Sequence, residues 1–267
     1  MEPNITQLYE KLKFDGYDCL YSKHEEGLAA HNREDYKPRL PMVRWKVGGR
    51  IPEYECPSRD YVLVVSDTHD DVVAMEHIIK MANAMGIKFM VHGGDIVHNN
   101  MMATFRDFRG RIFGALGNHD REIAAHYVHE HSQTDLKWDV NRFSIYGKRF
   151  VVTHGESVSE LGRMVDDERK NWNFLIYGHW HAPCFFQRDY NCVINPGMFT
   201  TAEPVFLLLN IQNPAESVYV KLEARIGTEY GIPAEAKEKE KEKEEEKEDH
   251  YSALQTTLSY STAASSL

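Results

Sequence analysis

Five short apolar segments each end just before a side chain that can bind a metal ion, and this repeated pattern constrains the fold more than any other feature of the chain. The segments are rich in β-branched and aromatic residues, which is typical of buried strands, and they cover residues 61–65, 87–91, 111–116, 150–153 and 174–177. Apolar residues at helical spacing predict a helix over 72–85, between the first two strands. This alternation indicates an α/β fold in which helices pack on largely parallel strands.

Further elements are expected between and after these strands. We expect helices near 121–130 and 158–170 and a strand over 205–211. The short turn inside 184–194 predicts an antiparallel pair, which would make Cys184 and Cys192 cross-strand neighbours. Both thiols are expected to be reduced, because four scattered cysteines are too few for a disulfide framework. Reduced thiols favour a cytoplasmic protein.

Polar side chains gather just past the carboxyl ends of the five strands. They are Asp67, His69, Asp95, Asn118, His119, Asp120, His154, His179 and His181. Residues i and i+2 of an extended segment point the same way, so Asp67 with His69, and His179 with His181, can each present two donors to one cavity. Ligands of open α/β sheets bind at this edge. The pattern therefore predicts a metal site with oxygen and imidazole ligands.

This ordered set resembles the calcineurin-like metallophosphoesterase superfamily over about residues 61–210. The matching motifs are Asp67-Thr-His69, Gly94-Asp95, Gly117-Asn118-His119-Asp120, His154-Gly155 and Gly178-His-Trp-His181. Their spacing is most similar to the small phosphodiesterase branch, which also includes the metallophosphoesterase-like retromer subunit. The resemblance implies a mixed α/β (α+β) fold, a four-layer α-β-β-α sandwich of two mixed sheets flanked by helices.

The resemblance also implies two divalent metal ions with a defined set of ligands. The first ion would be bound by Asp67, His69 and His181, the second by Asn118, His154 and His179, and Asp95 would bridge both. Oxygen and imidazole ligands without a thiolate suit several transition metals. We expect Mn²⁺, with Fe, Zn²⁺, Ni²⁺ and Co²⁺ as alternatives.

Hydrolysis of a phosphodiester is the expected reaction of such a site. A hydroxide bridging the two ions would attack phosphorus directly and in line. His119, which is outside the implied ligand set, would donate a proton to the leaving oxygen, as in the family. Asp120 would orient the His119 imidazole and raise its pKa. Two divalent ions and two carboxylates give the site a net charge of about +2, which attracts an anionic phosphate ester.

Three alternatives stay open. The break-repair nuclease of the superfamily shares the Gly-Asn-His-Asp motif but adds a capping domain that this chain is too short to contain, so a nuclease acting on DNA or RNA is one alternative. A phosphomonoesterase or protein phosphatase is the second. Protein phosphatases carry an Asp-Arg-Gly after the bridging Asp and a Glu after the catalytic His, whereas those places here read Ile96-Val97-His98-Asn99-Asn100 and Asp120. The third is a non-catalytic scaffold of the retromer-subunit type, against which the presence of His119 argues.

The 267-residue chain, with a formal net charge of -10, is expected to have three parts. Residues 1–60 would form an N-terminal arm or small subdomain packed on the core, and 61–233 the metallophosphoesterase domain. Residues 234–267 would be a disordered tail, because 235–249 carries nine acids and five lysines without an apolar face. The basic segment 37–50 is expected to form a surface hairpin or to contact an anionic partner. No apolar run is long enough for a membrane span, and a homodimer is an alternative to a monomer.

Overall fold

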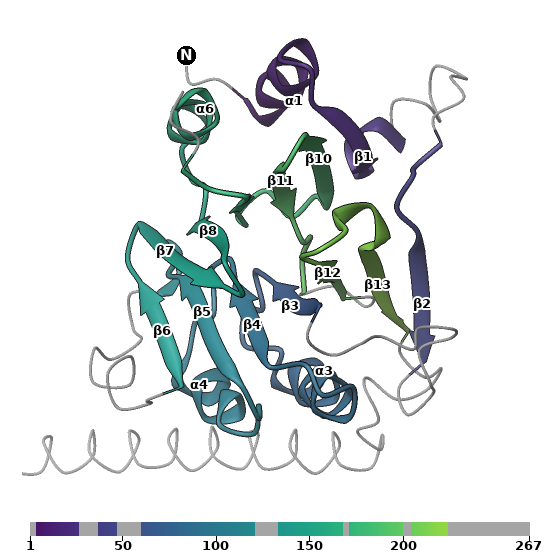
Figure 1. The fold of residues 1–267 in the computed structure, drawn as a ribbon. Helices are drawn as coiled ribbons and strands as arrows, with labels where there is room; N and C mark the ends of the chain where they lie inside the picture. The colour runs from purple at the N-terminus through teal and green to yellow at the C-terminus, as the bar shows by residue number, and fades with distance from the viewer. Residues whose placement is uncertain are drawn as a thin grey trace, which may run out of the picture. The chain divides into compact units, whose positions relative to one another are not determined.

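The computed structural model describes residues 4–26, 37–46, 60–120, 133–167, 171–199 and 204–223. Two mixed β-sheets pack face to face in this part of the chain (Figure 1). The six-stranded sheet has the order β1 (Asp18–Ser22), β10 (Cys184–Arg188), β11 (Asn191–Asn195), β9 (Phe174–Ile176), β8 (Lys148–Thr153) and β7 (Val140–Ile145). The seven-stranded sheet has the order β2 (Met42–Lys46), β13 (Val218–Glu223), β12 (Val205–Asn210), β3 (Tyr61–Val65), β4 (Phe89–His92), β5 (Arg111–Ala115) and β6 (Thr134–Lys137).

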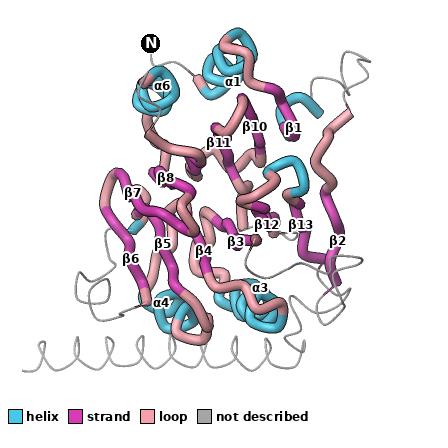
Figure 2. Tube along the Cα trace, viewed as in Figure 1, coloured by secondary structure: helices cyan, strands magenta, loops and turns pink. Residues whose placement is uncertain are grey.

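Helices cover the two outer faces of this pair of sheets. α1 (Ile5–Phe14) and α6 (Val158–Asp166) lie on the side of the six-stranded sheet, and α3 (Val72–Ala84) and α4 (Asn99–Phe105) on the side of the seven-stranded sheet. Figure 2 shows the same order by element type, with helices outside and strands between them. A short 3-10 turn, η2 (Pro214–Glu216), joins β12 to β13. The α-β-β-α sandwich expected from the sequence is confirmed.

The main core lies between the two sheets. Alternate residues of β3, Val62 and Val64, belong to this central cluster together with Phe150 and Phe174 from the opposite sheet. The intervening Leu63 is equally buried, so both faces of β3 are covered. A continuous apolar run such as 61–65 is what a strand covered on both faces requires.

The strands expected at 61–65, 87–91, 111–116, 150–153, 174–177 and 205–211 are present with small shifts of their ends. β3, β4, β5 and β6 pair in parallel, and so do β8 with β9 and β9 with β11. The helices expected at 72–85 and 158–170 are α3 and α6. The helix expected near 121–130 and the tail expected over 234–267 lie outside the described residues.

The first 60 residues contain a helix that the sequence analysis did not predict. Asn4 and Gln7 form a reciprocal capping box at the start of α1, and Leu8, Tyr9 and Leu12 are buried against α6 and the six-stranded sheet. β1 then joins the six-stranded sheet and β2 the seven-stranded sheet. Of the segment 37–50 that was expected to form a hairpin, only 37–46 is described; there β2 pairs in parallel with β13, and residues 47–50 lie outside the described part.

The predicted proximity of Cys184 and Cys192 is also wrong. β10 and β11 are antiparallel as expected, but Cys184 is opposite Asn195 and Cys192 is opposite Gln187. Cys184 packs in the cluster under α1 and α6, whereas Cys192 packs between the sheets. The two thiols therefore lie on opposite faces of the sheet. None of the described helices is both long and apolar enough to cross a membrane.

Candidate metal centre

The predicted site residues follow the ends of strands from both sheets. β3, β4 and β5 of one sheet lead into Asp67, Asp95 and Asn118, and β8 and β9 of the other lead into His154 and His179. Within the six-stranded sheet, Gly178 N–H donates to the His154 carbonyl at 3.0 Å. His154 Nδ1 lies 2.9 Å from the carbonyl oxygen of Gly93, which follows β4, and this contact joins the edges of the two sheets. Donors from distant parts of the sequence therefore meet at one edge.

Asp67, His69 and His181 form one group of possible ligands. One ligand atom from each lies within 4.8 Å of the others, close enough for all three to bind one ion. His181 Nε2 is 3.1 Å from Asp67 Oδ1. Asp67 is fully buried, His69 is half-buried and His181 is exposed, so the group opens from the core to the solvent.

Asp67, Asp95 and His154 form a second group by the same criterion, and all three residues are buried. The two carboxylate oxygens of Asp95 face different histidines: Oδ1 is 3.3 Å from His154 Nε2, and Oδ2 is 3.6 Å from His69 Nε2. Asp95 therefore lies between the two sets of histidines. Asp67 belongs to both groups. The resemblance had implied that Asp95 alone is shared between the two ions.

Asn118 and His179 adjoin the second group. Asn118 Oδ1 is 3.2 Å from His154 Nε2, so the amide oxygen and the imidazole nitrogen point into the same space. The His179 ring lies edge-on to the His154 ring, with centroids 5.1 Å apart. All seven residues that the sequence analysis assigned as metal ligands therefore gather at this edge.

Unusual backbone geometry is concentrated at these residues. Five of the seven have positive φ without being glycine: Asp67 (53°), His69 (39°), Asp95 (57°), His179 (63°) and His181 (55°). The left-handed conformation costs a residue with a Cβ roughly 1–2 kcal/mol. Strain of this kind typically accumulates where side chains must converge on one point.

Glycine is required where backbone and ligands come closest. A Cβ on Gly94, whose φ is 102°, would lie 2.6 Å from His154 Nδ1. A Cβ on Gly178 would clash with Ser66 Oγ and lie 2.7 Å from Asp67 Oδ2. The glycines of the Gly-Asp and Gly-His-Trp-His motifs therefore leave room for the ligands themselves.

Asp120 has different partners from those that the sequence analysis assigned to it. Its two carboxylate oxygens accept hydrogen bonds from the backbone N–H groups of Asp95, Ile96, Val97 and Gly117 at 2.6–3.0 Å. The residue is fully buried. Both oxygens thus bind the loops that carry Asp95 and Asn118. The expectation that the Asp120 carboxylate contacts the His119 imidazole is therefore corrected.

His119 is exposed beside the first group. Its ring centroid is 5.6 Å from that of His69, and its backbone N–H donates to Asp95 Oδ1 at 3.1 Å. His119 is in neither ligand group. Its ring is therefore available to a molecule bound at the site.

The electrostatics of the site depend on burial and on the carboxylates. Burial lowers the pKa of His69 and His179, which favours the neutral imidazole that a metal ligand needs. A hydrogen bond to Asp67 raises the pKa of His181. Burial alone would raise the pKa of Asp95, but hydrogen bonds from His154 and from the His119 backbone lower it to about 2.

Two further side chains support the motif loops, Trp180 from inside a motif and Asn195 from outside the motifs. The Trp180 indole N–H donates to the Gly155 carbonyl at 2.9 Å and ties two motif loops together. The buried Asn195 amide donates to the Gly178 carbonyl at 3.0 Å. Asn195 lies at the end of β11 and belongs to none of the motifs, so only the parallel pairing of β11 with β9 reveals its role.

The donor set fits divalent transition metals. His69 Nε2 is buried and has no hydrogen-bond partner in the described part of the chain, although an ordinary buried imidazole would have one. It faces the buried Asp95 carboxylate at 3.6 Å. Carboxylates, imidazoles and one amide oxygen without a thiolate are ligands of Mn²⁺, Fe, Zn²⁺ and similar ions.

The layered sandwich and the convergence of carboxylates and imidazoles at one edge define a phosphoesterase-type fold with a candidate metal centre. The family described as "Calcineurin-like phosphoesterase superfamily domain" matches residues 61–214. The chain therefore belongs to the calcineurin-like phosphoesterase superfamily.

The similarity to proteins named as phosphodiesterases agrees with this assignment. The chain is 27% identical to Phosphodiesterase MJ0936 of Methanocaldococcus jannaschii over 136 residues, which cover 50% of this chain and 81% of the relative. A solved archaeal phosphodiesterase superposes with a TM-score of 0.55 at 25% identity and covers 61% of this chain and 99% of its own. Vacuolar Protein Sorting 29 of Cryptosporidium parvum superposes with a TM-score of 0.44 at 16% identity and covers 56% of this chain and 84% of its own.

Proposed function

We propose that this protein is a phosphodiesterase that depends on two divalent metal ions, with Mn²⁺ as the first candidate. The observation that carries the proposal is the pair of overlapping ligand groups, with the two oxygens of Asp95 facing one histidine of each set. One ion would be held by Asp67, His69 and His181, and the other by Asn118, His154 and His179. Asp95 would offer one oxygen to each. The phosphodiesterase name of its relatives supports the reaction class.

When bound, two such ions supply Lewis acidity and a hydroxide nucleophile at neutral pH for direct in-line attack on phosphorus. His119 is exposed next to His69, and its imidazole would donate a proton to the leaving oxygen or stabilise its charge. Asp120 would act by holding the backbone around Asp95 and Gly117, since its carboxylate accepts their N–H groups. No covalent intermediate on a side chain is part of the proposal.

A panel of phosphate esters tests the reaction class. We expect the Mn²⁺-loaded protein to hydrolyse bis(4-nitrophenyl) phosphate with a higher kcat/KM than 4-nitrophenyl phosphate, and to lose the activity in a chelator. Preference for the monoester would favour a phosphomonoesterase. Absence of turnover with every ester in the presence of bound metal would favour a scaffold. Cleavage of DNA or RNA in preference to small diesters, falling steeply with salt, would favour a nuclease.

A further inference from the structure

A cavity of about 740 Å³ opens directly beside the candidate metal centre. Asn118 and His154, two of the assigned ligands, form part of its wall, together with Gly117 and Gly155 of the same motifs. A diester bound at the centre has two organic arms, and the cavity offers one of them a place to lie beside the centre. A cavity of several hundred cubic ångströms is the size that holds a drug-sized molecule.

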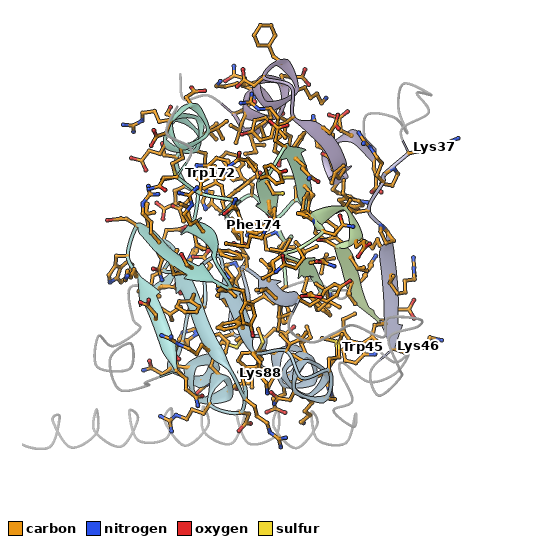
Figure 3. The ribbon with its side chains drawn as sticks, viewed as in Figure 1. Lys37, Trp45, Lys46, Lys88, Trp172 and Phe174 are labelled. Atoms are coloured by element: carbon orange, nitrogen blue, oxygen red, sulfur yellow. The ribbon has the colours of Figure 1, made fainter. Side chains whose placement is uncertain are left out.

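The floor of the cavity is apolar and fixed in place. Val151 of β8, Leu161 of α6 and Trp172 line it, and all three are buried in the cluster under α6. The Trp172 indole N–H donates to the Met164 carbonyl of α6 at 3.2 Å. Figure 3 shows Trp172 on the α6 side of the six-stranded sheet and Phe174 further toward the centre of the molecule.

The rim carries an exposed aromatic side chain. Trp138 follows β6 and lines the cavity, yet 53% of its surface is exposed to solvent. Large indole surfaces are usually covered in a folded protein, and an exposed one at a cavity mouth is typical of a binding site. A planar group that enters the cavity can stack on this ring.

The charges of the described lining residues argue against a second phosphate in the cavity. Four carboxylates line it, Asp139, Glu156, Glu160 and Asp167, against the guanidinium groups of Arg142 and Arg163. Arg163 is already within 3.3 Å of Glu160. An anionic arm would therefore meet more negative than positive side chains.

We infer that this cavity is the binding site for one ester arm of the substrate, and that the arm is an uncharged, aromatic-faced alcohol of about the size of a nucleoside. Its phosphate would lie at the metal centre, and its ring would stack on Trp138 above the floor of Val151, Leu161 and Trp172. Small diesters with neutral arms fit this cavity better than polynucleotides do. The inference rests on the proposed phosphodiesterase function.

Binding of small diesters to the Mn²⁺-loaded protein, measured by calorimetry, tests the inference separately from turnover. We expect diphenyl phosphate to bind more tightly than diethyl phosphate. Trp138→Ala should lower the affinity for diphenyl phosphate about tenfold and leave the affinity for diethyl phosphate unchanged, because only the aryl arm stacks on the indole. Trp138→Phe should restore most of the loss. Tyr190→Ala is the matched control, since Tyr190 is 81% exposed and does not line the cavity.

Equal affinity of diphenyl phosphate for the wild type and Trp138→Ala would overturn the inference, whether or not the esters are hydrolysed. Failure to hydrolyse any ester would instead contradict the proposed function. The charge argument is tested with the dinucleoside monophosphate TpT and the same molecule with a phosphate at each end. We expect the terminal phosphates to weaken binding at least tenfold. Tighter binding of the phosphorylated form would overturn the inference that the arm in the cavity is uncharged.

Discussion

The backbone N–H of Asp95 donates a hydrogen bond of 3.0 Å to the buried carboxylate of Asp120. Three further backbone N–H groups, from Ile96, Val97 and Gly117, donate to the same carboxylate. One side chain thus joins the loop after β4, which carries Asp95, to the loop after β5, which carries Asn118. The geometry of the candidate metal centre therefore depends on a residue that does not face it.

Replacing Asp120 should impair the metal centre and the stability together. Asp120→Ala leaves four backbone N–H groups without their acceptor, and we expect a loss of about 3 kcal/mol or more in the free energy of unfolding. Asp120→Asn keeps one acceptor oxygen, so its loss should be smaller. Metal affinity of Asp120→Asn, measured by calorimetry, should fall about 10- to 100-fold. Unchanged affinity would show that the loops hold their geometry without this carboxylate, and the exposed Asp107→Asn serves as the control.

His119→Ala should separate catalysis from metal binding. The ring is exposed and belongs to neither ligand group, so the variant should bind as much metal as the wild type. Loss of a general acid typically costs a factor of 10² to 10⁴, and we expect kcat for diesters to fall by that amount. His98→Ala is a useful comparison, because His98 pairs with Asp70 at 3.4 Å and lies outside both ligand groups. Wild-type activity in His119→Ala would remove this residue from the chemistry.

Two glycine substitutions form a matched pair. A methyl group on Gly178 meets Ser66 Oγ and Asp67 Oδ2, so Gly178→Ala should displace the buried ligand and reduce metal affinity. Gly162 lies in α6, and a methyl group there has no neighbour within 4 Å. Gly162→Ala should raise stability by about 0.5–1 kcal/mol and leave metal affinity unchanged. Equal metal affinity in both variants would contradict the close approach of Gly178 to Asp67.

The buried His92 should make the metal-free protein less stable in acid. Burial lowers the pKa of His92 from 6.5 to about 3, so the unfolded chain binds a proton below pH 6.5 that the folded protein does not accept until about pH 3. Stability is therefore lost as the pH falls through this window, by about 2 kcal/mol between pH 6.5 and 4.5. Denaturant unfolding of the wild type and His92→Gln at several pH values measures this difference, and parallel pH profiles of the two proteins would contradict it.

Much of this architecture could be predicted from the sequence because its signals are local. The run 61–65 is apolar at every position, as a strand covered on both faces must be, and β3 matches it. The motif residues follow the strand ends directly, so parallel strands with their carboxyl ends at one edge suffice to bring Asp67, Asp95 and Asn118 together.

Other features depend on pairing between distant segments and had no local signal. β2 lies beside β13, which is more than 170 residues away in the sequence, so its parallel edge position could not be read from residues 37–50. The direction of the Asp120 carboxylate depends on where the loop after β4 lies, which the Gly-Asn-His-Asp motif does not specify. The capping box of α1 was a local signal, and it was missed because the helix is short and its apolar face is narrow.

Metal content measured by mass spectrometry tests the central claim most directly. The protein saturated with Mn²⁺ and freed of excess ion should contain two ions per chain. His69→Ala removes one imidazole ligand of the first proposed ion, and His179→Ala removes one of the second. Each variant should contain fewer than two ions per chain. A folded wild-type protein that retains no divalent ion under these conditions would contradict the account.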